Sequence, residues 1–356
     1  MSVAIITGSC GLVGSAAVAH FAAQGMHVVG IDNDMRAEFF GPAASTNWMR
    51  DKFSGWQNYE HHSIDLRDHA AIHRIFRKFG SNISLVIHAA AQPSHDWSAQ
   101  NPDVDFAINA TGTLNVLEAM RTWSSDAAFI FLSTNKVYGD WVNTLPFVEE
   151  STRWELVPNH KYERGIDEHM PIDQTMHSLF GASKLAADIL VQEYGRYYEM
   201  TTAVFRCGCL SGPNHSGAEQ HGFLSYLLRC AVERKPYTIC GYKGKQVRDN
   251  LHSDDLVRAF QQFIDDPDRG GVVYNLGGGR RSNCSVIEAI AAIRALMDTA
   301  EMETGYYPRP RRGDHIWWIT DNNKFCTRYP EWQPVRTTEM ILADIYVSNE
   351  ARWCKT

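Results

Sequence analysis

The sequence predicts an α/β fold built on a doubly wound parallel sheet, with a second, smaller α/β lobe. Two observations favour this fold. Short apolar runs, of which residues 3–7 are the first, alternate with helical stretches over the first 206 residues, as expected for parallel strands buried on both faces. The chain has 356 residues, of which 44% are hydrophobic, so it is long enough for one large or two smaller cores.

The charge and cysteine patterns argue against several classes of protein. The net charge of −7 comes from interspersed residues of both signs, without a basic block for nucleic acid or a membrane surface. The eight cysteines contain no CxxC pair and the 15 histidines no metal-binding motif. We therefore expect reduced thiols, a cytoplasmic protein and no metal. Neither a signal peptide after Met1 nor a membrane-length apolar run is expected.

A glycine-rich turn separates the first expected strand, 3–7, from the first expected helix, 15–24. It reads GSCGLVG, with glycines at GxxGxxG spacing. Glycines permit a tight turn and a close backbone approach, and the free N–H groups at the helix N-terminus then face a pyrophosphate. This context favours a dinucleotide site of the Rossmann type over a plain strand-to-helix turn. The residues expected to line it are Gly8, Gly11, Leu12, Val13 and Gly14.

The second expected strand, 27–31, ends at Asp32-Asn33. Asp32 lies about 20 residues past the glycines, where an acid accepts hydrogen bonds from the adenosine ribose and would repel a 2′-phosphate. The expected cofactor is therefore NAD rather than NADP. Residues 35–59 are expected to form a loop with a short helix, before a third strand over 59–64.

The fourth expected strand, 84–88, is followed by AAAQ at 89–92. Small residues there let the backbone pass close to the diphosphate and the nicotinamide ribose. A helix is expected over 105–121 and a fifth strand over 129–132. The long stretch 141–177 is interpreted as an active-site wall or, alternatively, a surface loop. The other expected elements are helix 180–197 with Leu185, Ala186, Ile189 and Leu190 inward, strand 201–206, helix 223–233, a last strand 273–276 and a terminal helix 339–346.

The chain resembles the extended short-chain dehydrogenase/reductases over essentially its whole length. Their signature S[ST]xxVYG occurs as STNKVYG from Ser133. The resemblance implies that Thr134 contacts the reacting oxygen and that Lys184 holds the cofactor ribose. One helical turn before Lys184 the family has a Tyr that moves the proton. This chain has Phe180, which lacks the hydroxyl, at that catalytic position.

The resemblance also implies further cofactor-binding residues. Asp65 and Leu66 would border the adenine (a helix N-cap is the alternative for Asp65), and Asn109 lies in an expected active-site helix. Cys207 stands where related 4-epimerases have a bulkier residue, which opens space at the nicotinamide. The complete expected set is Gly8, Gly11, Leu12, Val13, Gly14, Asp32, Asn33, Asp65, Leu66, Ala89, Ala90, Ala91, Asn109, Lys184 and Cys207.

Two arginine motifs are implied to bind the substrate. Arg248 lies in VRDNLH, which matches the family's VRDxxH diphosphate clamp, and Arg311 matches the second phosphate-binding motif, RxGD. A guanidinium fork suits phosphate oxygens, so the expected substrate is a nucleotide-diphosphate sugar; a solvated surface arginine is the alternative. The expected substrate-binding residues are Gln92, Thr134, Asn135, Lys136, Phe223, Arg248 and Arg311.

Within the family, the chain is most similar to the CDP-paratose 2-epimerases, also called CDP-tyvelose epimerases. Asn135-Lys136 occupy the place where 4,6-dehydratases carry an Asp-Glu pair, so loss of water is not expected. The implied reaction inverts a sugar ring carbon, C2 in this subfamily, through transient oxidation to a keto-sugar and re-reduction. A 4-epimerase, an NDP-sugar dehydrogenase and a catalytically dead NAD-binding relative stay open.

The resemblance implies a division into two domains. An NAD-binding Rossmann domain would comprise residues 1–206 plus about 246–276, and a nucleotide-sugar-binding lobe 207–245 plus 277–356. A homodimer or homotetramer is implied as well, with helix 180–197 at a four-helix contact.

Phe180 admits two interpretations. It is an engineered, inactivating substitution that traps substrate, which the otherwise suitable surroundings favour. Alternatively, a natural protein has lost its proton-transfer group or moved it to Tyr162, Lys136 or Cys207. Loss of a general acid/base lowers the rate by roughly 10²–10⁴, or about 3–5 kcal/mol in the barrier. Because Phe and Tyr are nearly isosteric, folding and cofactor binding are expected to survive.

Overall fold

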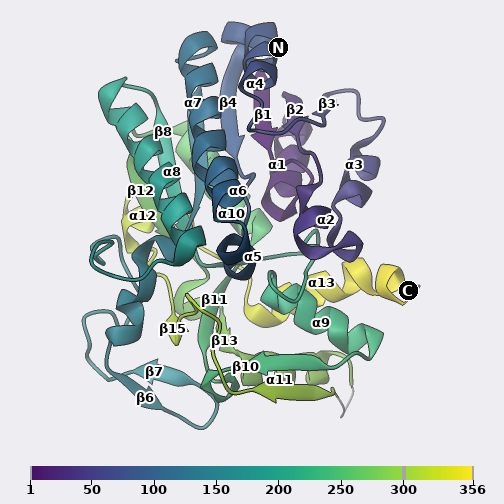
Figure 1. Ribbon diagram of the computed structural model, residues 1–356, viewed down its shortest axis with the longest axis vertical. Helices are drawn as coiled ribbons and strands as arrows, with labels where there is room; N and C mark the ends of the chain where they lie inside the picture. Colours follow the sequence, from purple (N-terminus) through teal and green to yellow (C-terminus); the bar gives the residue numbers. More distant parts are fainter. Residues whose placement is uncertain (1, 299–301, 355–356) are drawn as a thin grey trace. The chain divides into compact units, whose positions relative to one another are not determined.

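The computed structural model describes residues 2–298 and 302–354. They form two compact units (Figure 1). The first unit comprises Met1–Val137, Leu179–Arg206 and Val257–Tyr274, and the second comprises Tyr138–Ser178, Cys207–Leu256 and Asn275–Thr356.

A seven-stranded sheet forms the centre of the first unit, in the order β12-β8-β5-β4-β1-β2-β3. The pairs β1–β2, β1–β4, β2–β3 and β4–β5 are parallel. The doubly wound sheet predicted from the sequence is therefore confirmed. The strands are β1 (Val3–Thr7), β2 (His27–Ile31), β3 (Tyr59–His62), β4 (Ile83–His88), β5 (Ala128–Thr134), β8 (Thr202–Cys207) and β12 (Val272–Leu276).

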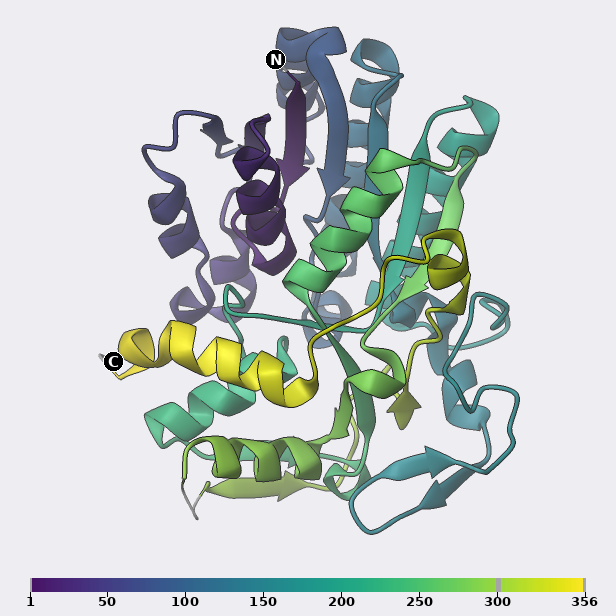
Figure 2. The same cartoon turned by 180° about the vertical axis from the view of Figure 1, so that it is seen from behind.

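Helices cover both faces of this sheet. Figures 1 and 2 show α4, α7 and α8 on one face, and α1 and α10 on the other. All five residues of β1 are buried as a result, which explains why the strands read as continuous apolar runs. The helices are α1 (Leu12–Ala23), α4 (His69–Phe79), α5 (His95–Gln100), α6 (Pro102–Phe106), α7 (Gly112–Trp123), α8 (Ser178–Tyr197) and α10 (Ser253–Asp265), which begins in the second unit.

The segment 35–59 is more ordered than predicted. It contains α2 (Met35–Phe40), a 3₁₀ turn η1 (Pro42–Ala44) and α3 (Asn47–Phe53). The carboxylate of Asp34 organises it by accepting hydrogen bonds from Ser45 Oγ and Asn47 Nδ2, each at 2.7 Å. Polar side-chain contacts of this kind produce no hydrophobic periodicity in the sequence, so the sequence pattern did not predict these short helices.

The helix predicted at 105–121 is interrupted. A π-helical turn, η3 (Ala107–Thr111), joins α6 to α7. π-helical turns are rare and frequently occur at functional sites.

The inward face of α8 also differs from the prediction. Ile189, expected inside, is 39% exposed, whereas Asp188 is fully buried. The reason is that Asp188 forms an ion pair with Arg206 on the neighbouring strand β8. Ile189, the next residue of the helix, is then left at the surface.

The second unit is built around β11 (Val247–His252). This strand pairs antiparallel with β13 (Asn283–Ser285) and parallel with β15 (Trp317–Trp318) and β9 (Cys209–Ser211). The prediction that strand 273–276 is the last one was wrong, because β13, β14 (Thr304–Tyr307) and β15 follow it. These strands have only three, four and two residues, too few for a recognisable alternation.

An apolar cluster joins α9 (Phe223–Glu233), α11 (Val286–Leu296) and α13 (Thr338–Trp353) within this unit. Buried side chains such as Leu227, Ile293 and Leu342 form its centre. The remaining elements include η4 (Asn135–Thr144), β6 (Phe147–Glu149), β7 (Trp154–Leu156), β10 (Tyr237–Cys240), η5 (Tyr242–Gly244), η6 (Gly279–Arg281) and α12 (Asn323–Arg328).

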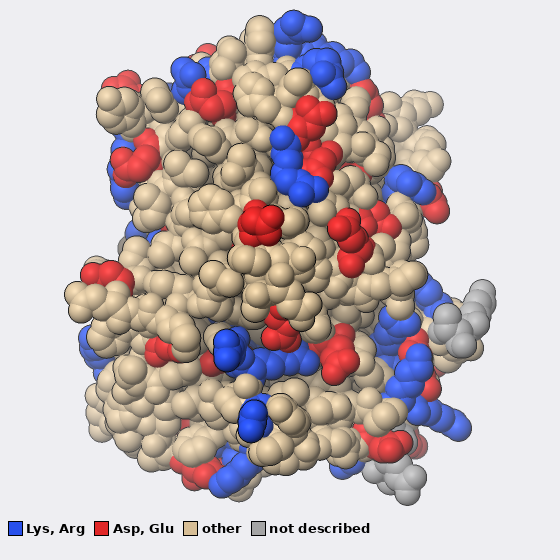
Figure 3. Space-filling view, in the orientation of Figure 1, with Lys and Arg blue, Asp and Glu red and all other residues tan. Residues whose placement is uncertain are grey.

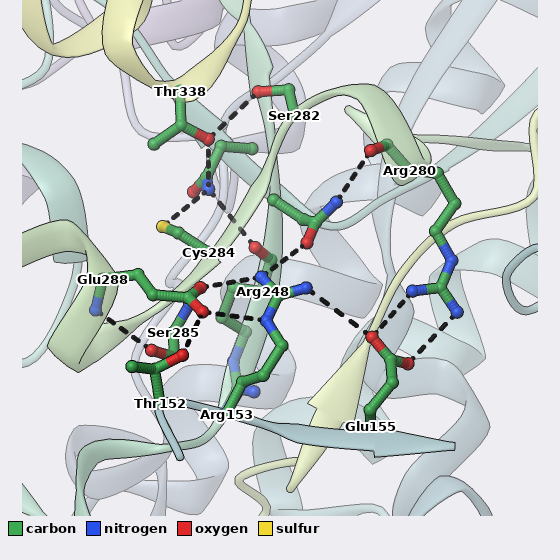
Figure 4. Close-up of polar contacts among 12 residues, drawn as sticks. Thr152, Arg153, Glu155, Arg248, Arg280, Ser282, Cys284, Ser285, Glu288 and Thr338 are labelled. Atoms are coloured by element: carbon green, nitrogen blue, oxygen red, sulfur yellow. Dashed lines mark hydrogen bonds and ion pairs between the residues drawn. The ribbon is translucent and has the colours of Figure 1, made fainter. Parts of the chain in front are cut away.

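Segment 138–178 is anchored to the rest of the second unit. It contains the β6–β7 hairpin, and Arg153 donates two hydrogen bonds to Glu288 of α11, at 2.7 and 3.0 Å (Figure 4). Arg280 pairs with Glu155 of the hairpin at 2.8 Å. The segment is therefore fixed by ion pairs, and its role as an active-site wall stays a prediction.

The face drawn in Figure 3 carries basic and acidic side chains interspersed. Across residues 2–298 and 302–354, no helix combines the length and apolar character needed to cross a bilayer. Within the same residues, no group of three or more His, Cys, Asp and Glu side chains is arranged to hold a metal ion.

Candidate active site

The glycine-rich turn lies where the strand order of the sheet reverses. β1 lies between β2 and β4, and Gly8 directly follows β1. Gly8 has a φ of +65°, and a Cβ added there would lie 2.9 Å from the Cα of Ala90, which follows β4. A Cβ on Gly14 would lie 2.0 Å from the carbonyl oxygen of Gly8. These approaches require glycine, and the N-terminus of α1 behind them fits a diphosphate.

Asp32 follows β2 and is tied to the same turn. Its Oδ2 accepts a hydrogen bond from the backbone N–H of Cys10 and its Oδ1 from that of Asp34, each at 2.9 Å. Burial raises the pKa of the Asp32 carboxyl above its ordinary value, and the two N–H groups lower it by less. Because a carboxylate oxygen can accept more than one hydrogen bond, Asp32 still fits the ribose hydroxyls of NAD.

Asp65 and Leu66 follow β3 at the same edge of the sheet. Arg67 engages the Asp65 carboxylate with two hydrogen bonds, at 2.7 and 3.0 Å, and this pairing lowers the pKa of Asp65. Asp68, rather than Asp65, is the N-cap of α4. Asn33 Nδ2 lies 3.5 Å from Asp65 Oδ2, so the structure brings these two predicted cofactor residues together.

A buried amide network joins the end of β4 to the first turns of α8. Asn109, in the π-helical turn, accepts from Gln92 N at 2.9 Å and donates to Gln92 O at 3.1 Å. Asn109 Nδ2 also donates to Asp105 Oδ1 at 3.2 Å and to Ser183 Oγ on α8 at 3.0 Å. The predicted residues Asn109 and Gln92 are therefore in contact. Sequence analysis missed Asp105, although its position four residues before Asn109 places both on one helix face.

Phe180, Lys184 and Asp188 recur at every fourth position of α8 and are all buried, with 6%, 3% and 0% exposure. Lys184 Nζ donates to the carbonyl of Leu132 on β5 at 2.8 Å. Asp188 accepts two hydrogen bonds from Arg206, at 2.8 and 2.9 Å. These contacts fix the helix that carries Phe180 and Lys184 against two neighbouring strands.

Ser133 and Thr134 are the last two residues of β5, and Asn135 and Lys136 follow them. Ser133 Oγ donates to Asp188 at 2.6 Å. Thr134 Oγ1 accepts from the backbone N–H of Lys136 at 3.2 Å and donates to Asn135 Oδ1 at 3.3 Å. Thr134 thus ends the strand whose Leu132 holds Lys184.

An imidazole is in contact with the ring of Phe180. His95 is the first residue of α5, and its ring centroid lies 5.0 Å from that of Phe180, with the planes at 78°. Sequence analysis did not single out His95. No motif surrounds it, and only the fold brings it to α8.

In the second unit, the two arginine motifs meet. Arg248 on β11 forms an ion pair with Asp314 of the RxGD motif, and the backbone N–H of Asp314 donates to the carbonyl of Arg311 at 3.1 Å. Arg311 Nη1 donates to the carbonyl of Glu219 at 2.8 Å. The side chain of Arg248 and the backbone of Arg311 therefore both contact Asp314.

The other predicted site residues divide between the units. Cys207, which is buried, and Phe223, the first residue of α9, belong to the second unit. The expected NAD-binding residues apart from Cys207 belong to the first. Tyr138 of the signature has a structural role in the second unit, because its hydroxyl donates to Asn275 at 2.7 Å and its ring stacks on Trp318.

Comparison with known proteins places this geometry in context. The NAD dependent epimerase/dehydratase family matches residues 4–277. CDP-paratose 2-epimerase of Salmonella typhi is 32% identical over 339 residues, 93% of this chain and 94% of that protein. The dTDP-glucose 4,6-dehydratase of Salmonella typhimurium is 29% identical over 350 residues, 94% of this chain and 89% of that protein. The structure of UDP-glucose 4-epimerase from Bifidobacterium longum, in complex with NAD+ and UDP, shares the fold, with a TM-score of 0.78, 23% identity and full coverage of both chains.

Proposed function

Because the chain belongs to the NAD dependent epimerase/dehydratase family, we propose that it is a nucleotide-sugar epimerase that inverts C2 of the sugar ring. The observation that carries the proposal is the link from Arg248 through Asp314 to Arg311. The two arginine motifs are thus joined within one unit, and guanidinium groups suit the oxygens of a diphosphate. The similarity to CDP-paratose 2-epimerase supports C2 as the carbon.

The family is NAD dependent, which confirms NAD as the cofactor predicted from the sequence. The close approaches at Gly8 and Gly14 and the carboxylate of Asp32 fit its diphosphate and its adenosine ribose. When bound, NAD supplies the redox chemistry, because it can take a hydride from the sugar carbon and return it. The overall reaction then needs no other oxidant.

Two side chains of the first unit would act on the reacting oxygen. The Thr134 hydroxyl, at the end of β5, can exchange hydrogen bonds with a sugar hydroxyl. The buried ammonium of Lys184 would favour negative charge on that oxygen as its proton leaves. Asn135 and Lys136 provide no carboxylate pair, which favours epimerisation over loss of water.

We also propose that residues 1–206 plus about 246–276 bind the cofactor, and that 207–245 plus 277–356 bind the nucleotide sugar. A homodimer or homotetramer through α8 is part of the proposal. It is supported by the exposed apolar side chains Leu179 and Ile189, at 49% and 39% exposure. Gel filtration with light scattering tests it, and a monomer at all concentrations would contradict it. A cytoplasmic location is likewise proposed, as expected from the scattered thiols.

The test of the reaction is an NMR assay of the NAD-loaded protein and its Phe180→Tyr form against a panel of NDP-sugars. We expect interconversion of two epimers at C2 without net formation of NADH. Accumulation of one NADH per turnover would instead identify a dehydrogenase, and inversion at C4 a 4-epimerase. NAD binding without affinity for any NDP-sugar would identify a catalytically dead relative.

The test of the substrate class is the double variant Arg248→Ala/Arg311→Ala. NDP-sugar binding, measured by calorimetry, should be abolished while NAD binding persists. Arg281→Ala is the matched control, because Arg281 is exposed and donates to the carbonyl of Val335. Unchanged NDP-sugar affinity in the double variant would overturn the assignment of a diphosphate.

Both interpretations of Phe180 make a prediction for this assay. If Phe180 inactivates the protein, Phe180→Tyr should raise the rate by roughly 10²–10⁴. If the proton-transfer group has moved, the protein should be active as it stands.

A further inference from the structure

The contact between Phe180 and His95 indicates where the proton-transfer group has moved. We propose that His95 is the general acid/base of this enzyme and that its imidazole replaces the phenol that Phe180 lacks. The inference rests on the proposed epimerase function and adopts the second interpretation of Phe180. It adds a catalytic residue that the sequence motifs do not contain.

The first argument is position. Phe180 is 6% exposed in the first turn of α8, and an added hydroxyl would extend from the far end of its ring. The imidazole of His95 lies against that ring, with centroids 5.0 Å apart and an edge-to-face angle of 78°. An acid/base group is thus in contact with the ring that stands in place of the phenol. His95 itself is partly exposed, so a ligand can reach it.

The second argument is that His95 is held in place relative to α8. Ser94, the N-cap of α5, exchanges hydrogen bonds with the side chain of Gln92, one of them at 3.0 Å. The backbone of Gln92 is bound on both sides by Asn109, which also donates to Ser183 on α8 at 3.0 Å. Three buried polar residues therefore connect the segment before His95 to the helix that carries Phe180. A general acid/base must be positioned in this way to work.

The third argument is chemical. The group must accept a proton in the oxidation half of the reaction and give it back in the reduction half. An imidazole has an ordinary pKa of about 6.5, so both of its forms are accessible near neutral pH. The other candidates from the sequence, Tyr162, Lys136 and Cys207, stay open as rivals. Lys136 belongs to the first unit and enters the test as a rival.

The proposed step balances as follows. The O–H bond of the sugar hydroxyl breaks, an N–H bond forms on His95, and the electron pair on oxygen becomes the second bond of the carbonyl. In this oxidation half, the sugar carbon gives up its hydrogen as hydride, and the nicotinamide would be the oxidant that accepts it. In the return half, hydride adds to the opposite face of the carbonyl carbon, and the imidazolium returns its proton to the oxygen.

The experiment is a cycle of four NAD-loaded forms: the unchanged protein, His95→Gln, Phe180→Tyr and the double variant. On the sugar identified by the NMR panel, His95→Gln should lower kcat by roughly 10²–10⁴, with little change in KM. The double variant should regain most of that loss, because the restored phenol replaces the imidazole. Such rescue also demonstrates that the Gln variant folds and binds correctly.

Two control variants accompany the cycle. His20→Gln changes another histidine that touches a phenylalanine edge-on, Phe21 at 4.9 Å, and should leave kcat unchanged. Lys136→Met tests the rival. If Lys136→Met abolished turnover while His95→Gln did not, the assignment to His95 would be overturned.

A readout independent of turnover is a crystal structure of the His95→Gln or unchanged holoenzyme with the NDP-sugar. We expect position 95 to lie within about 2.6–3.2 Å of the reacting hydroxyl oxygen. A separation too large for a hydrogen bond or a bridging water would overturn the inference. So would a protein active only as Phe180→Tyr, or equal kcat for His95→Gln and the unchanged protein. In contrast, failure of all four forms to epimerise any NDP-sugar would refute the proposed function itself, and the inference with it.

Discussion

Replacing Asp105 by Asn should stabilise the protein at neutral pH. Asp105 is 1% exposed, and its Oδ1 accepts a hydrogen bond from Asn109 Nδ2 at 3.2 Å. Its Oδ2 is buried and finds no hydrogen-bond partner in residues 2–298 and 302–354. An Asn at this position keeps the acceptor for Asn109 and removes a charge that is poorly solvated.

The magnitude follows from the pKa. Burial raises the pKa of Asp105 from 3.8 to about 6, against the smaller effects of Ser183 and the charge of Lys184. A carboxyl whose folded-state pKa is raised stabilises the fold below its unfolded pKa, and this contribution is lost as the pH rises through the folded pKa. The loss between pH 3.8 and 6 is about 3 kcal/mol, at roughly 1.4 kcal/mol for each pH unit. Asp105→Asn avoids it.

The assay is urea unfolding of both forms between pH 4.5 and pH 7.5. The variant's advantage in free energy of unfolding should grow from about 1 kcal/mol at pH 4.5 to about 3 kcal/mol at pH 7.5. Asp51→Asn is the control, because the Asp51 side chain is 70% exposed, and a change within about 0.5 kcal/mol at every pH is expected. A variant that is less stable at pH 7.5, or a difference independent of pH, would refute the reasoning.

Two further predictions concern α8 and the glycine turn. Asp188→Ala should lower the free energy of unfolding by roughly 3–5 kcal/mol, because it leaves Arg206 buried and unpaired. Arg196→Ala, which removes an exposed ion pair of the same helix, should lower it by less than about 1 kcal/mol. Equal losses for the two variants in urea unfolding would contradict the buried-pair argument. Gly14→Ala should abolish NAD binding in calorimetry, because its Cβ would lie 2.0 Å from Gly8 O; unchanged affinity would contradict the required close approach.

The elements predicted correctly are those with local signals. The helix expected at 223–233 coincides with α9, because its apolar residues recur at helical spacing and glycine precedes it. The strands of the sheet were predictable because burial on both faces makes each an uninterrupted apolar run. The strand β15, with the two residues Trp317–Trp318, has no such signal. Its existence depends on pairing with β11, which lies far away in the sequence.

The same distinction explains the candidate site. Lys184 and Phe180 could be recognised because helical spacing puts them on one face, and that spacing is readable in the sequence. The motif alone does not reveal which side chains surround Phe180, because it records positions along the chain and not distances in space. The contact with His95 arises because the segment after β4 lies next to the helix that packs on β5, which is the neighbour of β4 in the sheet. A motif position that carries an unexpected residue is therefore better interpreted from the side chains that surround it than from the motif alone.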